Sequence, residues 1–224
     1  MLNIGLEINS QITAKIGESI AETFFMIITA LVAAVIFGGI LGLILYMSSN
    51  KLFFKNKIIH GILGAVLNIV RSVPFLILMI FLLPLSALIV GTKIGSSAVI
   101  VPLSIASVAF FARLSEASFS DVDKGVIEAA VACGAKKSHI VIKILLPEAA
   151  VSLIKNITVT AISLLGFSAM AGLVGGGGIG DLAYRYGYQR YQQDVMIICV
   201  VILIVLVQII QIIGDATAKA VHRK

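Results

Sequence analysis

The chain is 224 residues long, 59% hydrophobic and 12% charged, with a formal net charge of +6. Soluble domains carry about 25% charged residues, so this composition excludes an ordinary soluble protein and indicates a membrane protein. The Lys and Arg residues are not clustered among aromatic residues, which argues against binding of nucleic acid.

Five uncharged stretches are long enough to cross a bilayer, for which a helix needs about 20 apolar residues. In chain order these stretches are Thr23–Met47, Ser72–Val90, Ile94–Ala112, Asn156–Gly175 and Val195–Gly214. We expect helices because the lipid interior offers no hydrogen-bond partner to an open backbone. The sequence therefore predicts an all-α, polytopic protein in which residues 1–224 form a single transmembrane domain with five transmembrane helices.

Lys and Arg residues are shared unevenly between the two sides of the predicted membrane. The loop at 48–57 carries three, the stretch 113–155 carries six and the C-terminal tail carries three, against four on the other side. By the positive-inside rule, the N-terminus is expected outside and the C-terminus in the cytoplasm. The segment 113–148, between the third and fourth spans, is then a cytoplasmic loop.

The centre of this loop reads EAAVACGAKKSHIVIKILLPEA from Glu128 to Ala149. Its helical period predicts a short helix over residues 121–133, capped by Ser120 or Asp121 and ended by a left-handed turn at Gly134. One apolar face of that helix is expected to be formed by Val122, Val126, Ala129 and Cys133.

A second short helix is predicted to start with Ser138 as its cap, and Pro147 is expected to break or bend the chain after it. Its apolar side would consist of Ile140, Val141, Ile144 and Leu145. Both helices could lie on the lipid surface, but an interfacial helix usually has large apolar residues and a dense Lys/Arg face. The small residues of the first helix instead favour a surface on which another protein docks.

The same segment resembles the EAA loop of bacterial ABC importer permeases. The sequence pattern of that loop is Glu-Ala-Ala, followed by a Gly and then by Ile-x-Leu-Pro. The matching residues are Glu128, Ala129, Ala130, Gly134, Ile144, Leu146 and Pro147. The resemblance implies that these residues form the coupling helices, which sit in a cleft of a separate cytoplasmic ATPase subunit.

Three further segments, at 70–84, 90–103 and 166–191, resemble the permeases of methionine-type ABC importers. The resemblance implies a multi-pass protein of the bacterial inner membrane that forms a homodimer. Its other partners would be two ATPase subunits inside and a substrate-binding lipoprotein outside. ATP would be hydrolysed by the partner subunit. In this chain we expect no catalytic activity, metal or cofactor, because His60, His139 and His222 are scattered and no metal-ligand or nucleophile spacing is present. The resemblance implies L- or D-methionine as the cargo, with another amino acid or small solute of the same importer class as the alternative.

The fourth span is rich in small residues and also carries Ser163, Ser168 and Met170. Small residues allow tight helix packing, which is one interpretation of this composition. The other interpretation is a lining of the translocation path, which the family resemblance assigns to this span. A flexible Met side chain adapts to irregular gaps, so Met170 is the predicted gate residue.

The glycine run Gly175, Gly176, Gly177 and Gly178 follows that span. A phosphate-binding loop is disfavoured because the run lacks the Gly-Lys-Ser/Thr ending. The remaining interpretations are a close-packed turn and a hinge for an outer gate.

Two other classes of function are possible alternatives to an importer permease. One is a stand-alone secondary transporter, which usually shows internal repeats and ionisable groups at mid-membrane. The other is a scaffold that anchors an ATPase without transporting.

Overall fold

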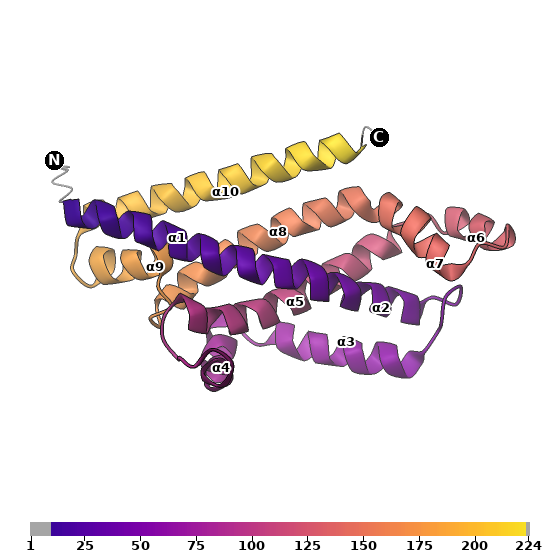
Figure 1. Cartoon of the computed structure of the whole chain (residues 1–224), viewed down its shortest axis with the longest axis horizontal. Coiled ribbons are helices and arrows are strands. Elements are labelled where there is room, and N and C mark those ends of the chain that lie inside the picture. The colour runs from indigo at the N-terminus through magenta and orange to yellow at the C-terminus, as the bar shows by residue number, and fades with distance from the viewer. Residues whose placement is uncertain (1–9, 223–224) are drawn as a thin grey trace. The chain divides into compact units, whose positions relative to one another are not determined.

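The computed structural model describes residues 10–222, and within this range every regular element is a helix (Figure 1). In chain order the elements are α1 (Ser10–Ala33), the π-helical turn η1 (Ala34–Gly38), α2 (Gly39–Ser49), α3 (Lys57–Ser72), α4 (Phe75–Val90), α5 (Ser96–Ser120), α6 (Lys124–Ala132), α7 (Lys137–Ile140), the π-helical turn η2 (Val141–Leu145), α8 (Leu146–Gly172), α9 (Gly178–Leu182), the π-helical turn η3 (Ala183–Tyr188) and α10 (Gln193–His222). The all-α prediction is confirmed for the described residues.

Among these residues, four helical stretches are long and apolar enough to cross a membrane: Ile12–Ser49, Ser96–Ser120, Lys137–Gly172 and Gln193–His222. A fifth candidate exists if α3 and α4, which are bent by 108° relative to each other, are counted as one span. The structure thus supports a multi-pass membrane protein with four or five spans.

The predicted span Ser72–Val90 differs from the structure, because α4 has only 16 residues and follows the unpredicted helix α3. Asn56 starts α3 by accepting hydrogen bonds from the backbone N–H groups of Ile58 (3.0 Å) and Ile59 (3.1 Å). The helix ends at Ser72, and Val73 after it is extended because the ring of Pro74 disfavours a helical residue before it. The sequence analysis missed α3 because its apolar residues are interrupted by polar ones.

The later helices run beyond the predicted spans. The structure has α5 at Ser96–Ser120, a continuous stretch at Lys137–Gly172 and α10 at Gln193–His222, where the sequence predicted Ile94–Ala112, Asn156–Gly175 and Val195–Gly214. A hydropathy-based prediction stops where the uncharged residues stop. These helices continue past that point into polar sequence at one end or both.

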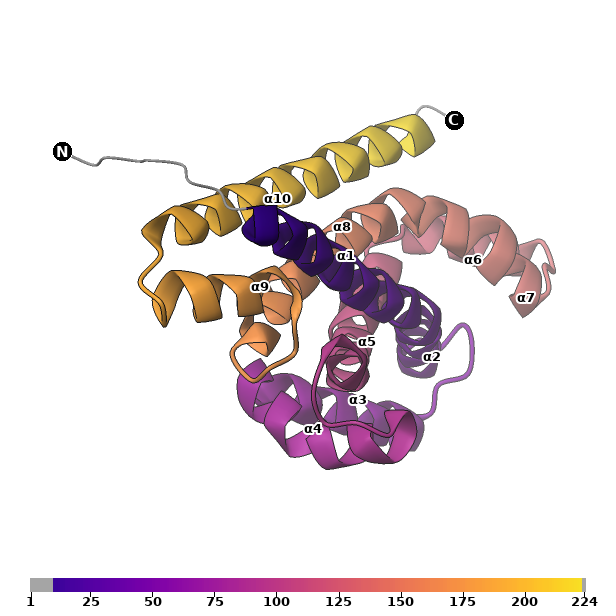
Figure 2. The ribbon, with the colours of Figure 1, turned by 60° about the vertical axis from the view of Figure 1, so that its left-hand side comes forward.

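Two compact units make up the chain, and the first comprises Met1–Leu31, Pro74–Ser104 and Ala161–Ile210. In its core, α9 and the start of α10 contribute the buried residues Ile179, Leu182, Val195 and Cys199, and α1 packs Ile12, Ile16 and Ile20 against them. Figure 2 shows α9 beside the first turns of α1. A stacked ring pair, Phe75 and Phe167 with centroids 4.6 Å apart, joins α4 to α8.

The second unit comprises Val32–Val73, Ile105–Thr160 and Gln211–Lys224. One of its buried clusters joins α2, α3 and α5 through Leu45, Leu67, Ala109 and Ala112. A larger cluster joins α2 and α5 to the segment 113–148: Tyr46, Phe53, Phe119, Val122, Ile127, Ile140, Val141, Leu145 and Ala149. This second cluster holds the predicted coupling segment.

Candidate functional site

The first helix of the predicted coupling segment, α6, starts and ends with specific local hydrogen bonds. The Asp123 carboxylate accepts the backbone N–H of Gly125 at 2.7 Å and caps the start of α6. The predicted caps, Ser120 and Asp121, were wrong: α5 extends through Ser120, whose hydroxyl donates to the Glu116 carbonyl at 2.8 Å. Sequence spacing did not reveal the longer α5, which moves the start of α6 to a later residue.

The predicted left-handed turn after α6 is confirmed at Gly134, where φ is 76°. The backbone N–H of Gly134 donates to the Val131 carbonyl at 2.9 Å, and the N–H of Ala135 donates to the Ala130 carbonyl at 3.1 Å. This pair of bonds is a Schellman motif, which satisfies carbonyls at the end of a helix. The turn sets the direction in which the chain continues into α7.

The helix after the turn starts at Lys137 with Lys136 in the cap position, and no side chain caps it, so the predicted cap at Ser138 was wrong. Of the predicted break or bend at Pro147, a break does not occur, because Pro147 lies in the first turn of α8. The π-helical turn η2 precedes it, and the Leu146 N–H bonds to the Val141 carbonyl five residues back. This wider turn brings the chain to a proline, which has no N–H to donate, without ending the helix.

The coupling segment is packed against its own unit. The predicted apolar side of the second helix is confirmed, since Ile140, Val141 and Leu145 are buried. The Lys137 ammonium also donates to the carbonyl of Phe53, in the loop between α2 and α3. The segment and that loop are therefore held together by an apolar cluster and by a charge-assisted hydrogen bond.

The exposed surface of α6 is partly apolar. Val126 is 42% exposed, with Ala129 and Cys133 exposed on the same side of the helix, while Val131 is 41% exposed on another side and Lys124 and Glu128 are also exposed. The four residues of the predicted apolar face therefore do not share one environment. Val122 is buried and precedes the helix, whereas Val126, Ala129 and Cys133 are exposed. The buried residue of α6 is Ile127, which was not part of the predicted face. Of the family-motif residues, Glu128, Ala129, Gly134, Leu146 and Pro147 are exposed, while Ala130 and Ile144 are half-buried.

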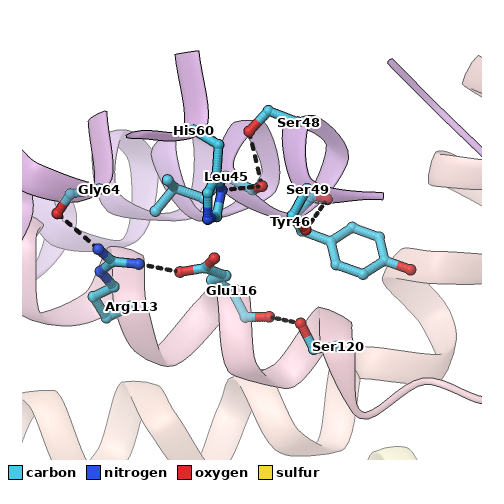
Figure 3. A network of polar contacts seen from close by, with 9 residues as sticks. All are labelled: Leu45, Tyr46, Ser48, Ser49, His60, Gly64, Arg113, Glu116 and Ser120. Atoms are coloured by element: carbon cyan, nitrogen blue, oxygen red, sulfur yellow. Dashed lines mark hydrogen bonds and ion pairs between the residues drawn. The ribbon is translucent and has the colours of Figure 1, made fainter. Parts of the chain in front are cut away.

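A polar network that the sequence did not reveal connects α3 to α5 (Figure 3). The Arg113 guanidinium donates to a Glu116 carboxylate oxygen and to the Gly64 carbonyl, each at 2.7 Å. A ring nitrogen of His60 lies 3.3 Å from the Leu45 carbonyl and joins α3 to α2. From the sequence alone, Arg113 contributed only one positive charge to the count that predicts the orientation of the chain.

The glycine run of the first unit is anchored by side chains of α1. The Glu22 carboxylate accepts the N–H of Gly178 at 2.6 Å, and the Thr23 hydroxyl oxygen accepts the N–H of Ile179 at 2.9 Å. Three glycines of the run, Gly175, Gly177 and Gly178, have positive φ angles between 74° and 79°, a conformation that suits glycine. The run is therefore a turn with defined contacts, and Glu22 and Thr23 are site residues that the sequence did not reveal.

A cavity of about 500 Å³ adjoins this turn and is lined by charges of both signs. Its charged lining residues are Lys15, Glu18, Glu22, Asp181, Arg185 and Arg190. Lys15 and Arg190 also lie over the ring of Tyr186, 4.7 Å and 4.4 Å from its centroid. The hydrogen bond from the Lys15 ammonium holds the pKa of the Tyr186 phenol below its usual value.

The three predicted path residues of α8 occupy different environments. Met170 is 47% exposed, and it shares an open face with Gly166 and Leu173, which are four and three residues away. Ser168 is buried, and its hydroxyl donates to the Leu165 carbonyl at 2.8 Å. Ser163 is half-buried. Met170 is therefore the one of the three whose side chain is open to a second molecule.

Comparison with known proteins gives the same family for most of the chain. The profile of the family described as "Binding-protein-dependent transport system inner membrane component" matches residues 34–224. The chain is 46% identical over 203 residues to the probable D-methionine transport system permease protein MetI of Vibrio cholerae, covering 91% of this chain and 90% of that protein. It is 46% identical over 181 residues to the methionine import system permease protein MetP of Bacillus subtilis, covering 81% and 82%.

Solved structures agree with the sequence relatives. A chain of the inward-facing MetNI methionine ABC transporter superposes with a TM-score of 0.92 at 38% identity, over 95% of this chain and 99% of that one. An amino acid ABC transporter gives a TM-score of 0.78 at 20% identity, which shows a shared fold. The chain therefore belongs to the family of binding-protein-dependent transport system inner membrane components, the permease subunits of ABC importers.

Proposed function

We propose that this permease carries methionine, as the L- or D-form, across the bacterial inner membrane with energy from a partner ATPase. The observation that carries the proposal is the 46% identity to two permeases named for methionine, each matched over more than four fifths of both chains. No side chain described above specifies methionine by its own chemistry. Another amino acid in the same importer class is therefore the second candidate cargo.

The coupling segment is the proposed docking site of the ATPase subunit. Its support is the combination of a buried side that packs on the permease and an outer face that stays apolar around Val126 and Ala129. Small exposed residues let a partner approach closely, and the Schellman turn at Gly134 holds the angle between the two helices. A rigid segment of this kind transmits ATPase movement to the spans, whereas a flexible one would absorb it.

The proposed orientation has the N-terminus outside and the C-terminus in the cytoplasm, with segment 113–148 inside. Its support is the excess of Lys and Arg on that side. In this orientation the glycine run and the charged cavity beside it face outward, toward a substrate-binding lipoprotein. The run is then the proposed hinge region of an outer gate, with the contacts of Glu22 and Thr23 as the bonds that its movement would break.

The proposed translocation path lies between two copies of the chain. A two-fold axis brings the same face of each copy together, and the open face around Met170 is a suitable one. Two Met side chains meeting at the axis would close the path by apolar contact and dewetting. Ser163 and Ser168 are proposed as path residues. Ser168 becomes accessible only if the unit rearranges, because in this structure it is buried and its hydroxyl is bonded to the Leu165 carbonyl.

The proposal can be tested with the permease, its ATPase and its binding protein assembled in lipid nanodiscs. Binding protein loaded with methionine is expected to stimulate ATP hydrolysis several-fold over unloaded protein, because delivery biases the ATPase states. Loading with leucine or histidine serves as the matched control. Equal stimulation by all three amino acids would contradict methionine as the cargo, and no stimulation by any would contradict coupling to a binding protein.

A further inference from the structure

A second cavity, of about 510 Å³, lies between α8 and the end of α10 within the second unit. Its lining residues are Val151, Lys155, Asp215, Ala218, Lys219 and His222. Neither the coupling segment nor the proposed path contains any of these residues. The cavity is therefore a feature that the transport function described so far does not explain.

The cavity opens next to a close crossing of the two helices. At Gly214 of α10, a Cβ atom would lie 2.0 Å from the hydroxyl oxygen of Thr158 on α8, so only glycine permits this approach. The helices run in opposite directions (Figure 1), so Val151 and Lys155, which precede Thr158 in α8, line the recess together with residues that follow Gly214 in α10. Ala218 is buried, and the long side chains around it are exposed. The result is a recess one to two turns past the contact.

The charge in this recess is mainly positive. Lys155 and Lys219 are exposed and form no ion pair within residues 10–222. The Asp215 carboxylate is the acid of the lining, and both of its oxygens accept hydrogen bonds from the Gln211 amide, at 3.1 Å and 3.2 Å. The two ammonium groups outnumber this one carboxylate, so the recess carries a net positive charge that favours an anionic ligand.

One side of α10 next to the recess is apolar. Ile212, two turns before Lys219 on the same side of the helix, is 65% exposed, and the span to which it belongs is the least buried of the candidate spans. A ligand that fits both surfaces has an anionic head and a hydrocarbon tail. Basic recesses between transmembrane helices at the cytoplasmic interface are known to bind acidic lipid headgroups.

We infer that this recess binds the phosphate-bearing headgroup of an anionic phospholipid, with an acyl chain along Ile212. The assignment to the inner leaflet rests on the proposed orientation of the chain, but binding itself does not. The site would fix the end of α10 against α8 at the membrane surface.

The test uses the complete transporter in detergent micelles, to which phosphatidylglycerol or phosphatidylcholine is added, with native mass spectrometry to count bound lipid. The double variant Lys155→Gln/Lys219→Gln removes both cations of the recess. Lys55→Gln/Lys57→Gln removes two exposed lysines outside it and is the matched control. Each lysine near an acidic lipid surface contributes about 1 kcal/mol, so the double variant should bind phosphatidylglycerol about 30-fold more weakly.

The expected result has four parts: preference for phosphatidylglycerol, its loss in the recess variant, its retention in the control, and weaker binding at high salt. Inorganic phosphate distinguishes a lipid from a free anion. If phosphate alone displaces phosphatidylglycerol at millimolar concentration, the recess is an anion site and the lipid assignment is wrong. Equal lipid binding by both variants overturns the inference. Loss of the ATPase subunit from the recess variant with lipid binding unchanged overturns it in favour of a protein contact.

Discussion

Replacing Gly134 by alanine would strain the turn between α6 and α7 without creating a steric clash. No atom lies within 4 Å of the position that a Cβ would occupy, so the cost comes only from the positive φ of 76°. A non-glycine residue in this region costs about 1–2 kcal/mol. This cost lowers the fraction of molecules in which the turn has the geometry needed for docking, by at most about 5- to 30-fold. The apparent affinity for the ATPase subunit falls by the same factor.

The assay compares ATPase binding and the number of ATP molecules hydrolysed per methionine transported. Gly134→Asn should lie between wild type and Gly134→Ala, because asparagine tolerates left-handed angles better. Gly61→Ala is the matched control, since Gly61 also has open space around it but sits within α3 at helical angles, where alanine is favourable. Wild-type affinity and coupling in Gly134→Ala would refute the argument that the turn holds the docking geometry.

Three further outcomes follow from the same account. In a background without native cysteines, Lys93→Cys should react with an impermeant thiol reagent added outside, and Lys136→Cys should not. The reverse labelling pattern would show that the chain has the opposite orientation. Met170→Cys should cross-link two permease copies in the resting complex, while Ile204→Cys, exposed on α10, should not; absence of the first cross-link would move the gate elsewhere. Arg113→Gln removes a charge-assisted bond and leaves its carboxylate partner unpaired, so denaturation of the complex should show a loss of about 1–2 kcal/mol at this partly exposed pair. Arg113→Lys should restore only part of that stability, because lysine lacks the planar fork, and an unchanged midpoint in Arg113→Gln would mean that the network is not stabilising.

The sequence predicted the features of this fold that depend on local chemistry. Apolar length located the four long candidate spans but not the bent pair of α3 and α4, and the turn at Gly134 followed from the cost of left-handed backbone for other residues. The buried side of the second coupling helix, with Ile140 and Leu145, followed from its period. These properties are set by a few neighbouring residues, so they can be read from short segments.

The parts that the sequence did not reveal depend on residues far apart in the chain. The contact of Glu22 with Gly178 joins positions 156 residues apart, and that of Arg113 with Gly64 joins positions 49 apart. No local pattern marks either pair. The cap of α6 was missed because α5 continues to Ser120, so the helix starts later, with the local bond between Gly125 and Asp123.

The most direct test of the central claim is uptake of radiolabelled methionine by proteoliposomes that contain this permease, its ATPase inside and its binding protein outside. The account predicts accumulation that requires enclosed ATP and the binding protein, and that excess unlabelled methionine abolishes. A permease paired with an ATPase variant that cannot hydrolyse ATP is the control. Methionine uptake driven by an ion gradient without ATP, or no methionine uptake by a complex that hydrolyses ATP, would contradict the account.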